Sequence, residues 1–210
     1  MQPVKLTIIY YSASGTNYQI ALAIKDAAEG AGADVRLRKA RELAPDSAID
    51  RWPAWRAHLE ATRHIPEAAH EDLEWADAYI FGTPTRFGNI AAQLKQFIDT
   101  TSGLWSQGKL ANKVVAAFTS AGNDHGGQES TLLALHNTFY HWGSYIIPPG
   151  YTSDVVALAG GNPYGVSAKA TDDGTIAPTI VRAAEHMAQR VVSVTQWLKA
   201  GREALELVAT

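Results

Sequence analysis

The chain has 210 residues, of which 46% are hydrophobic and 19% are charged, with a formal net charge of −3. This composition is typical of a globular protein, and the weak negative charge argues against a nucleic-acid partner or binding to an anionic membrane. The absence of cysteine excludes disulfides, thiolate metal sites and cysteine redox chemistry, so any electron transfer must rely on a bound cofactor.

Five short apolar runs, rich in β-branched residues, are predicted to be strands. In chain order they cover residues 5–11, 34–38, 78–82, 113–118 and 145–147. Most are apolar almost throughout, which is typical of strands covered by helices on both faces of a sheet. The first run leads directly into a polar loop and is too short for the apolar core of a secretory signal. No run approaches the ~20 apolar residues that span a bilayer, so we expect a cytoplasmic protein without a membrane span.

Four segments have apolar residues at helical spacing. They lie at about 20–30, after Asn89, around 132–142 and over 180–199. Gly30 and Gly32 are expected to end the first helix, and Asn89 is expected to be the N-cap of the second.

Strands that alternate with helices indicate βαβ units and a parallel sheet. Five strands favour a three-layer αβα sandwich of the flavodoxin type, with strand order 2-1-3-4-5, over a closed barrel, which needs ~250 residues. We expect one domain over residues 1–210. Two long segments, 40–77 after the second strand and 152–178 after the fifth, are predicted to be irregular insertions with functional or interface roles.

The loop after the first strand, Ser12 to Asn17, contains three hydroxyl side chains and one amide around Gly15, and no lysine. It therefore lacks both the P-loop signature of nucleotide triphosphatases and the glycine pattern of dinucleotide-binding folds. Its side chains and the backbone N–H groups of a helix N-terminus suit a phosphate monoester. Taken alone, the loop is better explained as a capped turn without a ligand, because Ser, Thr and Asn caps are common.

The loops after the third and fourth strands are also rich in glycine and polar residues. "GTPTRFGN" frames Thr85, Arg86 and Phe87 with two glycines, and "SAGNDHGGQE" begins at Ser120. Either loop alone is compatible with a sharp turn, and Arg86 with a solvated surface charge. Asp124 and His125 raise the question of a metal, but the nearby histidines lack ligand spacing, so no metal site is predicted.

The three loops follow strands of one parallel sheet and therefore emerge at the same edge, where open α/β sheets bind ligands. A phosphate at the first loop and a planar ring across the other two, without cysteine or metal, indicates flavin mononucleotide (FMN).

The motifs in this order resemble the tryptophan-repressor-binding protein A (WrbA) family, which are flavodoxin-like type IV NAD(P)H:quinone oxidoreductases. The matching stretches are "YYSASGTNYQIA", "IFGTPTRFGN", "TSGLWSQGKLANKVVAAFTS", "GGQE" and "IIPPGY…GGNPYG". Together they extend from the N-terminus to about Gly165. The combination of "GTPTRFGN" with "GLW" is the most specific part of the match.

The resemblance implies which residues hold FMN. The phosphate would be bound by Ser12, Ala13, Ser14, Gly15, Thr16 and Asn17. The ribityl chain and isoalloxazine ring would be lined by Pro84, Thr85, Arg86, Phe87 and Gly88. The far side of the ring would contact Ser120, Ala121, Gly122, Asn123 and Gly126. Catalytic contacts are implied for His141, near the pyrimidine edge of the ring, and for Trp105, which would form part of the nicotinamide and quinone pocket across a subunit interface.

The resemblance also implies an activity: NADH or NADPH gives a hydride to flavin N5, and a quinone is then reduced to the hydroquinone by two electrons. It implies self-association as a homotetramer, a dimer of dimers, built partly by the two insertions. Two departures from the family pattern stand out. Ser14 occupies a position that is aromatic in some relatives and contacts the nicotinamide there, and the third loop is one residue longer than in some members.

Two alternatives belong to other functional classes. A flavodoxin-like electron carrier would bind FMN without turning over a substrate, but the weak net charge and the aromatic insertions argue against it. An interaction protein that keeps the fold without flavin is the third possibility, and the sequence has no basic surface signal for a DNA-related role.

Overall fold

The computed structural model describes residues 2–208. Its parallel sheet has the order β2-β1-β3-β5-β6, so the predicted order of five strand positions is confirmed. The strands are β1 (Lys5–Tyr10), β2 (Asp34–Lys39), β3 (Ala78–Arg86), β4 (Asn89–Ile90), β5 (Val114–Ala121), β6 (Tyr145–Ile146) and β7 (Val166–Lys169). β3 and β5 extend beyond their predicted ends, and both carry polar residues to the carboxyl edge of the sheet.

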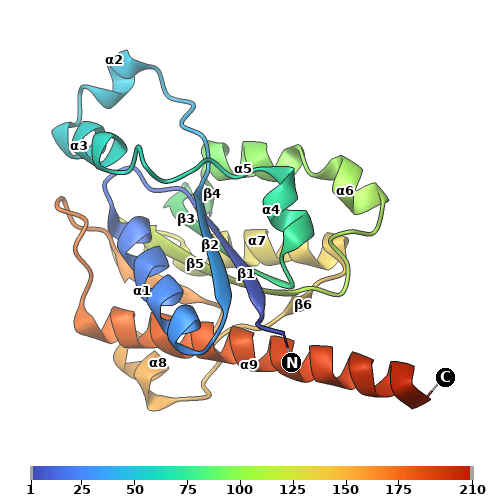
Figure 1. The fold of residues 1–210 in the computed structure, drawn as a ribbon. Helices are drawn as coiled ribbons and strands as arrows, with labels where there is room; N and C mark the ends of the chain where they lie inside the picture. The colour runs from blue at the N-terminus through green and yellow to red at the C-terminus, as the bar shows by residue number, and fades with distance from the viewer. Residues whose placement is uncertain (1, 209–210) are drawn as a thin grey trace.

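Helices cover both faces of the sheet, which gives the predicted three layers (Figure 1). They are α1 (Thr16–Gly30), α2 (Asp46–Ile49), α3 (Pro53–Ala61), α4 (His70–Trp75), α5 (Ala92–Asp99), α6 (Ser102–Ser106), α7 (Gln128–Trp142), α8 (Asp154–Leu158) and α9 (Pro178–Val208). Helices α1 and α9 pack together on one face, and α5 and α7 pack on the other. Among residues 2–208, none of the helices has the length and apolarity needed to cross a membrane.

The alternation of side chains along β1 explains why the strands look apolar throughout. Leu6, Ile8 and Tyr10 are buried against α1 and α9, whereas Ile9 belongs to the core under α5 and α7. Both faces of the sheet thus face a core, as the continuous apolar runs predicted.

The fifth strand position differs from the prediction because two separate strands fill it. β6 pairs with the beginning of β5, at Val114 and Val115, whereas β7 pairs with its end, from Phe118 to Ala121. The first part of the expected insertion 152–178 therefore lies between the two halves of the fifth strand position, and only the part after Lys169 follows the completed strand. The first part includes helix α8, and the segment predicted to be irregular contains a strand of the sheet.

The other insertion and Asn89 also differ from the sequence-based expectations. Residues 40–77 contain three short helices, α2, α3 and α4, instead of an irregular loop. Asn89 is not an N-cap, because it lies in β4 and pairs with Arg86 in an antiparallel hairpin. Positive φ angles at Phe87 and Gly88 reverse the chain there, so helix α5 begins only after Ala91, which is its N-cap.

Candidate functional site

The three loops predicted to share one edge of the sheet line a common pocket. It lies at the carboxyl ends of β1, β3 and β5. The residues that line it and that the sequence predicted to bind the cofactor are Ser12, Ala13, Ser14, Thr16, Asn17, Pro84, Thr85, Arg86, Ser120, Ala121 and Gly122. The structure thereby brings together most of the cofactor-binding residues expected from the sequence.

The first loop presents hydrogen-bond donors at the start of α1. Gly15 is the N-cap, with φ of 105°, and its N–H donates to Ser12 Oγ at 3.1 Å. The following N–H groups have no carbonyl one turn earlier in the helix, so they are free to bind an anion. Thr16 Oγ1 is buried and has no hydrogen-bond partner among the described residues. The first turn of α1 contains no acidic residue, and this donor set fits a phosphate monoester.

Asn17 organises the loop as well as lining the pocket. Its Nδ2 donates to the carbonyl oxygen of Tyr11 at 3.2 Å and ties the start of α1 to the end of β1. The buried Oδ1 atom of Asn17 has no partner among the described residues. A bound group that donates a hydrogen bond, such as a hydroxyl, would satisfy this oxygen.

The second loop contributes Thr85 and Arg86 to the pocket. Thr85 Oγ1 donates to the carbonyl oxygen of Gly126 at 3.3 Å and so links the second loop to the third. Arg86 is the one cationic residue among the described residues that line this pocket. Phe87 and Gly88 do not line it, and the Phe87 side chain is fully exposed at a φ of 53°.

The third loop is divided between the pocket and its own internal hydrogen bonds. Ser120, Ala121 and Gly122 line the pocket, but Asn123 and Gly126 do not. Asn123 Oδ1 accepts from the N–H of His125 at 3.1 Å, and its carbonyl oxygen accepts from Gln128 Nε2 at 2.8 Å. These bonds stabilise a turn that carries the chain away from the pocket and into α7.

His141 and Trp105 are not brought to the pocket within one chain. The indole N–H of Trp105 donates to the carbonyl oxygen of His141 at 2.7 Å, so the two residues do lie together. His141, however, is at the C-terminal end of α7, whose 15 residues span about 22 Å. The helix begins at the carboxyl edge of the sheet and ends beside the start of β5, so it carries His141 to the opposite edge.

Two segments that the sequence did not assign to the site support the first loop from behind. A Cβ atom added at Gly174 would lie 2.6 Å from the carbonyl oxygen of Ser14 and 3.0 Å from the Cα of Gly15. Gly174, with φ of 74°, therefore allows the segment after β7 to rest on the loop. Helix α3 approaches the other side, where His58 packs on the Tyr18 ring at 5.5 Å between ring centroids. The sequence indicated a role for these segments only because both lie within the predicted insertions, residues 40–77 and 152–178.

Glu42 anchors the first of these insertions to the sheet. Its carboxylate accepts from the hydroxyl of Tyr11 at 2.9 Å, from Trp55 Nε1 at 3.0 Å and from Gln93 Nε2 at 2.9 Å. Burial acts to raise the pKa of Glu42, but these bonds and one from the N–H of Ala44 outweigh it, so the pKa lies below its ordinary value. Glu42 therefore stays ionised and fixes the chain just before the phosphate loop.

His58 makes the stability of this region depend on pH. Burial, followed by the charge of Lys39, lowers the pKa of His58 from 6.5 to about 4. The unfolded chain therefore binds a proton more readily than the folded one between these values, and stability falls as the pH drops from 6.5 toward 4. Allowing for partial solvent screening, we expect a loss of about 1–2 kcal/mol.

Urea unfolding of the apoprotein at pH 6.5 and pH 5 would measure this loss, and His58→Gln is expected to make the difference between the two values smaller. His125, which is exposed in the third loop, gives the matched control His125→Gln. An unchanged pH dependence in His58→Gln would show that His58 is not the group responsible.

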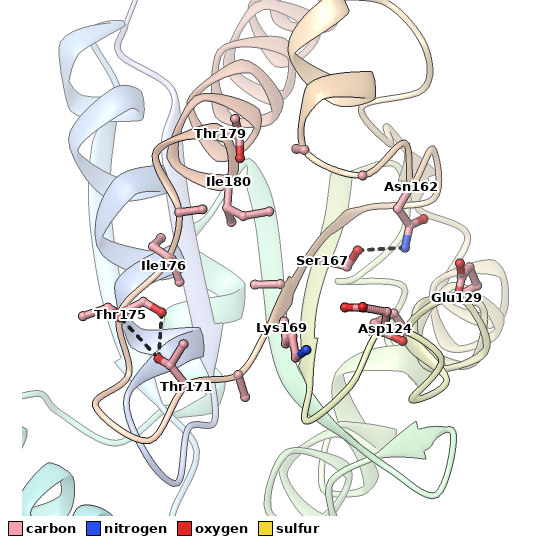
Figure 2. A pocket seen from close by; sticks show the side chains of 16 residues that line it. Asp124, Glu129, Asn162, Ser167, Lys169, Thr171, Thr175, Ile176, Thr179 and Ile180 are labelled. Atoms are coloured by element: carbon pink, nitrogen blue, oxygen red, sulfur yellow. Dashed lines mark hydrogen bonds between the residues drawn. The ribbon is translucent and has the colours of Figure 1, made fainter.

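A second and larger cavity adjoins the pocket. It has a volume of about 630 Å³ and lies between the third loop, β7 and the start of α9 (Figure 2). Ala170, directly after β7, lines both cavities. The described residues contain no group of histidine and acidic side chains placed to hold a metal ion.

Comparisons with known proteins show the family of the chain. Residues 4–157 match the family model described as NADPH-dependent FMN reductase. A protein from Deinococcus radiodurans named NAD(P)H dehydrogenase (quinone) is 54% identical over 168 residues, which are 80% of this chain and 84% of that protein. A protein of the same name from Aromatoleum aromaticum is 40% identical over 96% of this chain and 100% of its own length.

Solved structures show the same fold. The flavodoxin, WrbA-like protein from Agrobacterium tumefaciens superposes with a TM-score of 0.64 at 21% identity, covering 92% of this chain and 98% of the other. The family match covers most of the chain, and the relatives are similar over most of their length. The chain therefore belongs to the NADPH-dependent FMN reductase family.

Proposed function

We propose that the protein is an FMN-dependent NAD(P)H:quinone oxidoreductase that reduces quinones to hydroquinones. The observation that carries this proposal is the phosphate loop at the start of α1. There the buried Thr16 hydroxyl, which has no partner among the described residues, shares one pocket with the first N–H groups of the helix and with Arg86. The family match and the names of the two relatives support the same activity.

Each loop has a distinct task in this proposal. Ser12 to Asn17 hold the phosphate without a lysine. No phosphoryl group is transferred in this reaction, so no lysine is needed to stabilise a leaving phosphate. Thr85, Arg86 and Ser120 to Gly122 enclose the ribityl chain and the ring. When bound, FMN supplies hydride acceptance from NADH or NADPH and two-electron delivery to a quinone.

We also propose that the protein assembles as a homotetramer in which His141 and Trp105 serve a neighbouring subunit. Within one chain these two residues lie together at the edge opposite the pocket, so only another subunit's flavin could meet them. Trp105 and Phe87 are exposed aromatic residues, a type that is enriched at interfaces. A cytoplasmic location completes the proposal, in line with the cysteine-free sequence.

An anaerobic titration tests the activity. The purified protein is expected to bind FMN and to show flavin absorbance that bleaches with NADH or NADPH and returns with benzoquinone. A protein that holds FMN but is reduced by neither nucleotide would be an electron carrier instead. A colourless protein that rejects added FMN would contradict the proposal and leave the interaction-protein alternative.

A further inference from the structure

The 630 Å³ cavity beside the flavin pocket has no role in the function described so far. One wall is β7 with its side chains Ser167 and Lys169, and another is formed by Asp124 of the third loop and Glu129 of the first turn of α7 (Figure 2). Ile176 and Ile180 supply an apolar end. Its size lies within the range of small-molecule sites, about 300–1,000 Å³.

The cavity adjoins the flavin pocket along the carboxyl edge of the sheet. Ala168 and Lys169 of β7 pair in register with Ser120 and Ala121 of β5, which line the flavin pocket. Ala170 lines both spaces. A molecule that reaches the flavin ring at one end can therefore extend into the cavity at the other.

The chemistry of the walls suits a nucleoside joined to phosphate. Ile176, which is half-buried and packs on the core that contains Ile180, offers an apolar surface for a flat base. The carboxylates of Asp124 and Glu129 can accept hydrogen bonds from ribose hydroxyls. Lys169 supplies a positive charge for a pyrophosphate at the side nearest Ala170. Asn162 is already fixed, since its Nδ2 donates to Ser167 Oγ at 3.1 Å, which gives the cavity a preformed polar wall.

We propose that this cavity receives the adenosine half of the nicotinamide dinucleotide, while the nicotinamide reaches the flavin pocket. This inference rests on the proposed function. Two carboxylates against one ammonium group disfavour an additional phosphate on the ribose, so the cavity prefers NADH to NADPH.

Direct binding of ADP-ribose, which lacks the nicotinamide ring, tests the site without turnover. Isothermal calorimetry on the FMN-loaded protein is expected to detect ADP-ribose binding and to lose it in Ala177→Trp, where an indole would fill the cavity. The matched control is Ala204→Trp, at an exposed position near the other end of α9, and it is expected to bind normally. Absent binding in the wild type, or binding unchanged by Ala177→Trp, would overturn the inference.

Kinetics with a truncated co-substrate separate this inference from the proposed function. Reduced nicotinamide mononucleotide lacks the adenosine half, so Ala177→Trp is expected to raise KM for NADH by about tenfold or more and to leave turnover of the mononucleotide unchanged. If the wild type and Ala177→Trp oxidise NADH equally well, the proposed function stands and the adenosine site is refuted. A protein that reduces FMN with neither co-substrate fails at the level of the function itself.

The charge argument has its own readout. The double variant Asp124→Asn, Glu129→Gln is expected to raise the ratio of kcat/KM for NADPH over NADH by about tenfold. Lys169→Gln is expected to weaken ADP-ribose binding without changing FMN affinity. An unchanged cofactor ratio in the double variant would overturn the preference for NADH, and unchanged ADP-ribose binding in Lys169→Gln would remove Lys169 from the site.

Discussion

Replacing Gly82 with alanine is expected to lower the free energy of unfolding by about 3 kcal/mol. Gly82 lies in β3 directly beside Phe118 of β5, and the Phe118 ring covers the place where a Cβ atom would be. Phe118 is fully buried under α1 and α9, so the ring has little room to move. Urea unfolding of the wild type and of Gly82→Ala would measure the loss.

A double-mutant cycle identifies the cause of this loss. In a Phe118→Leu background, Gly82→Ala is expected to cost at least about 1 kcal/mol less than in the wild type, because the ring that it overlaps is gone. Gly201→Ala in α9 is the control, since a Cβ atom there meets nothing within 4 Å. That variant is expected to be neutral or slightly more stable. Equal costs of Gly82→Ala in both backgrounds would exclude the steric explanation.

Thr16→Val is expected to weaken FMN binding by about tenfold to a hundredfold, as the loss of a hydrogen bond to a charged phosphate would. Valine keeps the shape of the side chain but removes the buried hydroxyl that has no partner among the described residues. For the same reason, the apoprotein is expected to become slightly more stable, because an unsatisfied buried hydroxyl is removed. Fluorescence titration with FMN and urea unfolding of the apoprotein measure the two effects.

The opposite signs of these effects make the test of Thr16 specific. Thr195→Val in α9 is the matched control, since that buried hydroxyl already donates to the carbonyl oxygen of Val191 at 2.7 Å. It is expected to lose a little stability and to keep its FMN affinity. If Thr16→Val gained stability and bound FMN like the wild type, the hydroxyl would not be a phosphate donor.

The layers of the fold were predictable because both faces of the sheet are buried. Runs such as residues 5–11 and 113–118 are apolar on both sides, which only a covered parallel sheet explains well. The shared edge for three loops followed from the parallel topology alone. These features depend on local patterns and on a general rule of sheet geometry.

The divided fifth strand was not predictable, since β6 has two residues and β7 has four, too few to show a period. The prediction of Asn89 as a helix N-cap was wrong because asparagine favours both helix N-caps and tight turns. His141 had a clear position in a helix, but the sequence did not show that the helix leads away from the pocket. The contact of Gly174 with Ser14 joins segments far apart in the chain, and no local pattern reports such a contact.

The interruption of the fifth strand makes the segment between its two halves a separable module. Ile146 pairs with Val115 and Val166 pairs with Phe118. Ile147 and Gly165 are therefore the residues on either side of the interruption, and by register they lie opposite Ala116 and Ala117 of β5. The chain thus leaves the sheet and re-enters it without losing register. The length and sequence of residues 148–164 can change over evolution, or by loop exchange, while the sheet stays intact. Because Asn162 belongs to that module, such a change can reshape the larger cavity independently of the phosphate loop.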